Sequence, residues 1–163
     1  MRVKKLLLAC MLAALPILFA APQTSVPDGF EHWTNSALQP VVQHLSVQAA
    51  ADPHRFAVQQ LADFPNESFL LVHREADGPP EWHETQIDIF FVQSGSATLV
   101  LGGTYVNGET VAPHEKRNGT IEGGTRQKLN AGDVVRIPAR VPHQLLLEGA
   151  REFTYLVVKG KGY

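Results

Sequence analysis

Two histidines and two carboxylates between positions 81 and 143 are residues of the types that bind divalent metal ions. Glu81 and His83 are separated by one residue, so their side chains lie on the same face of an extended strand. Asp88 follows His83 at the wrong parity for one continuous strand, which predicts a bend between them. His143 comes after a Pro-Ala-Arg-Val-Pro turn. If these groups converge, they form a metal site with positions left open for a ligand.

Glycines anchor the two segments that carry these residues. The first segment spans residues 78–95, with four residues between His83 and Asp88 and six between Asp88 and Gly95. The second spans residues 132–143 and has the pattern Gly, five residues, Pro, four residues, His.

Both segments resemble the paired motifs of the cupin superfamily, which are small β-barrels of jelly-roll type. In the first motif the resemblance puts Glu81, His83 and Asp88 at the positions of two histidines and a glutamate. In the second it puts His143 at the position of the last histidine, while Arg140 stands where glycine is usual. The match covers about residues 66–159.

The resemblance implies a divalent metal site made by His83, Asp88, His143 and Glu81. Two neutral imidazoles and two carboxylates nearly balance a divalent charge and favour Mn or Fe, with Zn or Ni as further possibilities. If Glu81 turns away, the other three still form a set of two histidines and one carboxylate. The alternative is a metal-free barrel that keeps its histidines for hydrogen bonding.

Other polar residues have side chains that suit a pocket, but the sequence does not decide whether these side chains point into the barrel or toward solvent: Arg74, Tyr105, Gln127, Arg136 and Gln144. The remaining histidines are expected at the surface or in loops: His32, His44, His54, His73 and His114. Of these, His114 lies in a long polar segment, residues 104–128, from which it could reach the site.

One helix is expected before the strands. Its apolar stripe has the i, i+3, i+4, i+7 spacing: Leu38, Val41, Val42 and Leu45. Asn35 or Ser36 would cap a helix of roughly 12 residues, with Pro40 tolerated only in the first turn. Because Asp52-Pro53 disfavours helix, it should end near Ala51.

From Phe56 onward short apolar runs alternate with Gly, Pro and Asn, which is typical of a sandwich or barrel. The expected strands are Ser68–Arg74, Ile87–Gln93, Ala97–Leu101, Asp133–Ile137, Gln144–Leu147 and Phe153–Val158. Their core residues should include Phe90, Val92, Leu99, Ile137, Leu145 and Val157. We therefore expect an all-β fold, a cupin-type jelly-roll β-barrel with one short N-terminal helix.

The N-terminus has the order of a secretory signal peptide, because three basic residues precede an apolar run at residues 6–21. Cleavage is expected after Ala20, which predicts a secreted or periplasmic protein. The domain organisation is then a signal peptide at 1–20, a linker and helix at 21–65, and a cupin β-barrel domain at 66–160.

Composition fits one folded domain: the 163 residues are 44% hydrophobic and 18% charged. The single cysteine, Cys10, lies in the predicted signal peptide, so the mature chain would have no disulfide. Cleavage removes three of the fourteen basic residues and none of the sixteen acidic ones, leaving a net charge of −5. This charge argues against nucleic acid, and against a membrane after signal cleavage, as partners.

Two functions of different class fit these features. The first is a metal-dependent oxidoreductase, isomerase or lyase acting on a small molecule, as the cupin resemblance implies. The second is a non-catalytic module that binds a sugar or another small metabolite, with or without metal. By analogy with cupins, a homodimer formed through edge strands or the N-terminal segment is possible.

Overall fold

The computed structural model describes residues 25–163. The predicted signal peptide therefore lies outside the described residues. The chain divides into two units, residues 1–32 and 33–163. In the described part of the first, residues 25–32, the only regular feature is a turn at Asp28-Gly29. All elements below belong to the second unit.

Helix α1 spans Asn35–Ala51 and begins one residue earlier than predicted. Its N-cap is Thr34, whose hydroxyl oxygen accepts a hydrogen bond from the backbone N–H of Ala37 at 3.2 Å. The predicted caps and the predicted length of about 12 residues were wrong: the helix has 17 residues. Pro40 lies inside it, beyond the first turn, on an exposed stretch where water can satisfy the carbonyl that loses its partner. No helix in the described part of the chain combines the length and apolar character needed to cross a bilayer.

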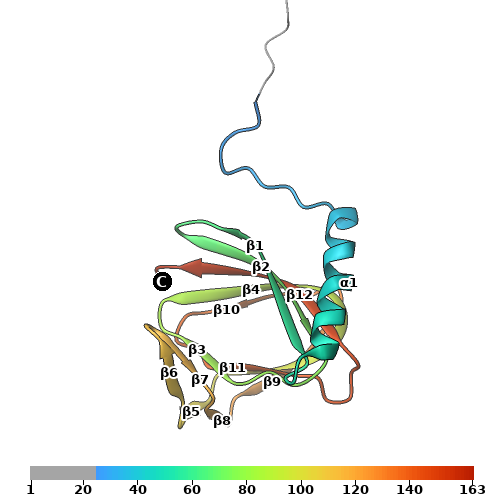
Figure 1. Ribbon diagram of the computed structural model, residues 1–163. Coiled ribbons are helices and arrows are strands. Elements are labelled where there is room, and N and C mark those ends of the chain that lie inside the picture. Colours follow the sequence, from blue (N-terminus) through green and yellow to red (C-terminus); the bar gives the residue numbers. More distant parts are fainter. Residues whose placement is uncertain (1–24) are drawn as a thin grey trace, which may run out of the picture. The chain divides into compact units, whose positions relative to one another are not determined.

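The helix lies against the outer face of the first two strands (Figure 1). Leu45 and Ala49 are fully buried there against Ala57 and Leu71, which forms a small second core. The stripe predicted from the sequence is the face that makes this contact.

Twelve antiparallel strands make up the rest of the second unit (Figure 1). Their bounds are β1 Phe56–Asp63, β2 Glu67–Arg74, β3 Glu81–His83, β4 Gln86–Leu101, β5 Thr104–Val106, β6 Glu109–Ala112, β7 Glu115–Arg117, β8 Thr120–Glu122, β9 Thr125–Asn130, β10 Val134–Ile137, β11 His143–Leu146 and β12 Phe153–Lys161.

The long strand β4 connects the two halves of a curled ten-stranded sheet. Its first half pairs with β12 and β10, in the order β1-β2-β12-β4-β10. Its second half pairs with β9 and β11, and the sheet continues from β11 through β3 and β7 to β6. Strands β5 and β8 form a separate pair. The all-β, jelly-roll barrel expected from the sequence is confirmed.

Two runs predicted as separate strands merge into β4 at Gly95. This glycine has a φ of 75°, and a Cβ there would lie 2.0 Å from the carbonyl oxygen of Glu152. Only glycine fits so close an approach with that backbone conformation. The glycine that marked a strand end in the sequence is therefore a bend within one strand.

The main core lies between the two halves of the sheet. It contains all six residues predicted for it, each at most 5% exposed, together with Leu129, Phe153 and Tyr155. The inner face of β4 carries Asp88, Phe90 and Val92 at alternate positions. Asp88 thus continues an otherwise apolar row toward the end of the barrel where the candidate site lies.

Candidate metal centre

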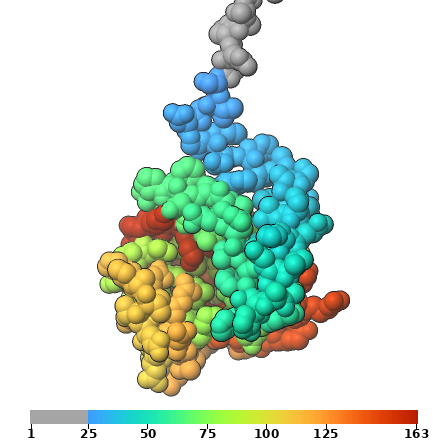
Figure 2. Space-filling model, in the orientation of Figure 1, coloured from blue at the N-terminus to red at the C-terminus, as the bar shows by residue number. Residues whose placement is uncertain are grey.

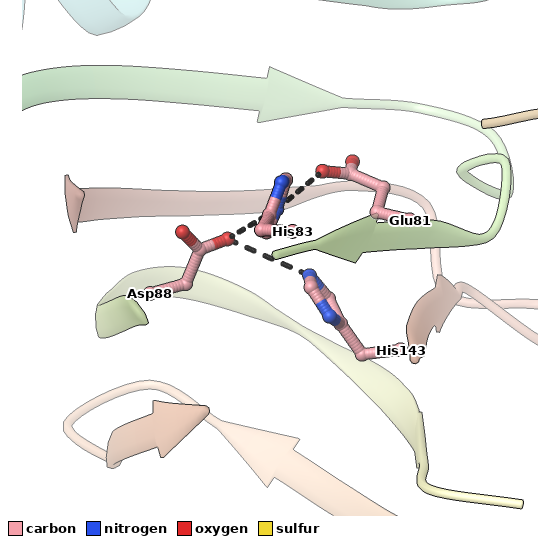
Figure 3. A group of neighbouring side chains, drawn as sticks. All are labelled: Glu81, His83, Asp88 and His143. Carbon is pink, nitrogen blue, oxygen red and sulfur yellow. Dashed lines mark ion pairs between the residues drawn. The ribbon is translucent and has the colours of Figure 1, made fainter. Parts of the chain in front are cut away.

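Four side chains from three strands meet at one end of the barrel. Glu81 and His83 come from β3, Asp88 from the start of β4 and His143 from the first position of β11 (Figure 3). One ligand atom from each lies within 4.8 Å of all the others. The predicted bend between His83 and Asp88 occurs at residues 84–85, and it turns the carboxylate toward the imidazole.

Asp88 lies between the two imidazoles. Its Oδ2 atom is 3.4 Å from Nε2 of His83 and 3.5 Å from Nε2 of His143. The Oε2 atom of Glu81 is 3.4 Å from Nε2 of His83 (Figure 3). The two histidines and Asp88 are at most 3% exposed, so the donor atoms are shielded from bulk water.

Strand register holds these residues in place. His143 pairs with Glu81 across β11 and β3, so a histidine and a carboxylate predicted from separate motifs are direct neighbours. Asp88 pairs with Lys159 across β4 and β12. The site therefore depends on sheet pairing between residues more than 60 positions apart.

Hydrogen bonds orient both imidazole rings with Nε2 toward the cluster. His83 is bonded through Nδ1 to the Glu115 carboxylate at 2.5 Å, and His143 donates from Nδ1 to the carbonyl oxygen of Val141 at 3.1 Å. Because a carbonyl oxygen only accepts, Nε2 of neutral His143 carries a lone pair. This buried atom makes no hydrogen bond with any described residue. Such an arrangement is typical of histidines that bind metal ions.

The protein also brings its own cations to the site. The Lys159 ammonium group lies 2.9 and 3.1 Å from the two oxygens of Asp88 and 3.3 Å from Nε2 of His83. Nη1 of Arg117 lies 2.5 Å from Oε2 of Glu81, and Nη2 of Arg74 lies 3.8 Å from Oε1 of the same carboxylate. The expectation that the two carboxylates would balance only the charge of a metal ion was therefore incomplete, because the lysine and the two arginines already neutralise them.

These contacts shift the acid–base behaviour of the cluster. Burial disfavours the charged form of Asp88, but the neighbouring imidazoles of His143 and His83 and the charge of Lys159 outweigh it and hold its pKa well below the usual range. For Glu81, burial is likewise outweighed, by His83 and Arg117, and its pKa is lowered. Burial would lower the pKa of His83, but its three carboxylate neighbours raise that pKa to about 10.

A cavity of about 820 Å³ opens beside the four residues. Glu81, Asp88 and His143 line its polar end. Apolar side chains line much of the remaining wall: Phe56, Val58, Leu70, Val72, Phe90 and Val157. Figure 2 shows a hollow between the green segment that contains β1 and the yellow-to-orange segment 104–122, and both segments contribute to the cavity wall.

Of the five polar residues singled out from the sequence, Arg74 and Gln144 line this cavity. Gln127 and Arg136 are exposed, and the hydroxyl of Tyr105 contacts the carbonyl of Pro80 instead. One expectation for the histidines was wrong, because His73 is buried in β2, with Nδ1 2.8 Å from the Thr154 hydroxyl. His54 is exposed in the turn after α1, as expected, and it also lines the cavity. His114 is exposed and pairs with Glu84.

The sequence did not indicate Glu115, Arg117 or Lys159. Lys159 was detectable, because it continues the alternation of Tyr155 and Val157 on the inward face of β12. The other two lie on β7, which pairs with β3 over a long sequence separation, and no local spacing predicts that pairing.

The residues present fit a divalent ion. Two imidazole Nε2 atoms and two ionised carboxylates surround one point, and His143 presents a buried lone pair that no described group uses. The Lys159 ammonium is the group that a metal ion would have to displace from Asp88.

No known family profile matches the sequence, and no curated protein matches it. Among solved structures, the protein TT1209 from Thermus thermophilus is similar over 74% of this chain and 93% of its own, with 16% identity and a TM-score of 0.52. The cupin domain of Schizosaccharomyces pombe Cnp3 is similar with 11% identity and a TM-score of 0.50. That match covers 66% of this chain and 65% of the Cnp3 domain. At such identities the likeness concerns the fold alone.

Proposed function

We propose that this chain, which has the cupin fold, binds a divalent metal ion through His83, Asp88, His143 and Glu81 and acts on a small molecule in the adjoining cavity. The observation that carries the proposal is the convergence of four ligand atoms within 4.8 Å, among them Nε2 of His143, which makes no hydrogen bond with a described residue. Mn or Fe suits the mixed nitrogen and oxygen donors, and Zn or Ni is compatible with them.

A bound divalent ion would supply Lewis-acid chemistry to a ligand in the cavity. The chain's own residues do the rest. Glu115 fixes the ring of His83, the Val141 carbonyl fixes that of His143, and the apolar wall excludes water from the ligand. The reaction class this supports is that of an oxidoreductase, isomerase or lyase.

The second candidate is a non-catalytic module that binds a sugar or another small metabolite. The contact between Lys159 and Asp88 favours it, because the cluster is already compensated by protein charges without any metal ion. This module could work with or without metal, and a stable protein that contains no metal after purification would favour it over the first candidate.

The direct experiment is elemental analysis of purified mature protein, with His83→Ala and His143→Ala as variants. We expect near-stoichiometric metal in the parent protein and loss of it in both variants. His114→Ala is the matched control, because that histidine is exposed and lies outside the cluster. A well-folded parent protein without metal would contradict the metal site and favour the binding module.

We also propose export to the periplasm or the medium, on the basis of the N-terminal sequence pattern. Cell fractionation with N-terminal sequencing tests it, and a mature chain starting at Ala21 is expected. The homodimer remains a further proposal, which the molecular mass in solution tests.

A further inference from the structure

The cavity wall contains one cationic group that makes no hydrogen bond to the cluster and only a long contact with it. Of the three cations that line the cavity, Lys159 contacts both oxygens of Asp88 and Arg117 contacts Glu81. The third, Arg74 at the end of β2, is 6% exposed. Its nearest carboxylate, Glu81, is 3.8 Å away and already paired with Arg117.

Arg74 has donors to spare. Its one hydrogen bond among the described residues runs from Nε to the hydroxyl of Tyr155, at 3.4 Å. A guanidinium carries five N–H donors in a planar fork, so both terminal nitrogens remain available. Because Arg74 lines the cavity, these N–H donors are open to a ligand or to water inside it.

The surroundings hold this fork beside the cavity. The Phe56 ring lies under it, 4.3 Å from ring centroid to Cζ. On another side is Gly78, where an added Cβ would come within 3.0 Å of Nη1 and 3.1 Å of Cζ. The absence of a side chain at position 78 therefore leaves room for the guanidinium in its observed place.

We propose that Arg74 binds the carboxylate of a small-molecule ligand whose apolar part fills the rest of the cavity. This inference rests on the proposed function, because it assigns the ligand class of the same site. A single free guanidinium matches one carboxylate in a two-pronged contact. A phosphate dianion is disfavoured, because Glu81 and Asp88 line the same end of the cavity. The apolar side chains of the wall suit a hydrocarbon or aromatic body.

The test is calorimetric titration of the full mature protein with hexanoate, hexanamide and hexyl phosphate. We expect hexanoate to bind at least tenfold more tightly than hexanamide and more tightly than hexyl phosphate. Arg74→Met should abolish the preference for hexanoate, while Arg126→Met should leave it unchanged. Arg126 is the matched control because it is half exposed, pairs with Glu148 and lies outside the cavity wall.

A second variant guards against a folding defect at position 74. Gly78→Ala keeps every charge but crowds the guanidinium, so hexanoate binding should weaken while hexanamide binding does not change. Equal binding of acid and amide, tighter binding of hexyl phosphate, no binding of hexanoate, or an unchanged preference in Arg74→Met would each overturn the proposal.

Metal analysis of the same samples separates this proposal from the previous one. Metal-free protein that binds hexanoate through Arg74 supports the carboxylate subsite and removes the metal centre. Metal-loaded protein that does not discriminate acid from amide overturns the subsite and leaves the metal centre intact.

Discussion

Replacing Lys159 with methionine should strengthen metal binding. The ammonium group of Lys159 holds Asp88 through two contacts of 2.9 and 3.1 Å and lies 3.3 Å from His83. A metal ion that binds these residues must remove that contact. Methionine has a similar length and no charge, so Lys159→Met leaves Asp88 free for the metal ion.

The size of the effect follows from the free energy of the contact that Lys159 must lose when a metal ion binds. Repulsion between an ammonium and a divalent ion about 4 Å apart is on the order of 8 kcal/mol at an effective dielectric constant of 20. The Lys159 side chain is 20% exposed, so it can swing toward solvent and avoid this repulsion. The remaining cost is a charge-assisted hydrogen bond, about 1.5–3 kcal/mol. Lys159→Met should therefore tighten metal binding roughly 10- to 100-fold.

The measurement is competition between the protein and a chelator for Mn²⁺, followed for the parent protein and the variant. Lys161→Met is the matched control: Lys161 is also on β12, but its ammonium contacts Asp63 and the carbonyl of Phe64. Its affinity for Mn²⁺ should equal that of the parent.

The reasoning would fail if Lys159→Met bound Mn²⁺ no more tightly than the parent while remaining folded. A stability measurement gives a second check. Without metal the variant should unfold at a lower temperature than the parent, because Asp88 loses its counterion. Saturating Mn²⁺ should then raise its unfolding temperature more than that of the parent.

Three further predictions concern the orientation of the His83 ring, the protonation of His83 and the packing of helix α1. Glu115→Gln removes the charge that orients His83, so Mn²⁺ affinity should fall about 10- to 100-fold in the chelator assay; an unchanged affinity would exclude this role. Because the pKa of His83 is raised to about 10, a metal ion must displace its proton. The affinity for Mn²⁺ should therefore rise about tenfold per pH unit between pH 6 and 9 and level off above pH 10. A flat profile in chelator titrations at several pH values would refute this. Leu45→Ala should lower the free energy of unfolding, measured by urea denaturation, by about 2–5 kcal/mol, because Leu45 is fully buried. Val47→Ala is the control: this residue of the same helix is 69% exposed, and its substitution should change that free energy by at most about 0.5 kcal/mol.

The sequence was most informative where a local pattern decides the structure. Alternating apolar residues predicted most of the long strands, and the resemblance of the glycine and histidine spacing to the cupin motifs predicted the fold and the four residues that meet. The core residues followed from the same alternation. The helix boundary was less accurate, because Thr34 and Asn35 are adjacent and both have side chains that can cap a helix, so the sequence does not separate them.

What the sequence did not predict depends on pairing across the sheet. Glu115 and Arg117 reach the site because β7 pairs with β3, and Lys159 meets Asp88 through the register of β12 with β4. These contacts join residues 32 to 76 positions apart. Charge compensation at the site is for this reason a property of the folded sheet, which counting ligands in the motifs overlooks.

The short strand β7, only three residues long, holds two residues of the candidate site in place. It supplies the acceptor for His83 and the counterion for Glu81, and its other neighbour is β6, whose four residues are all exposed. Lifting this hairpin away would release one histidine ring and one carboxylate together, and would also open the cavity wall at Arg117. Access of a ligand and affinity for an ion would then vary together, controlled from the rim of the barrel.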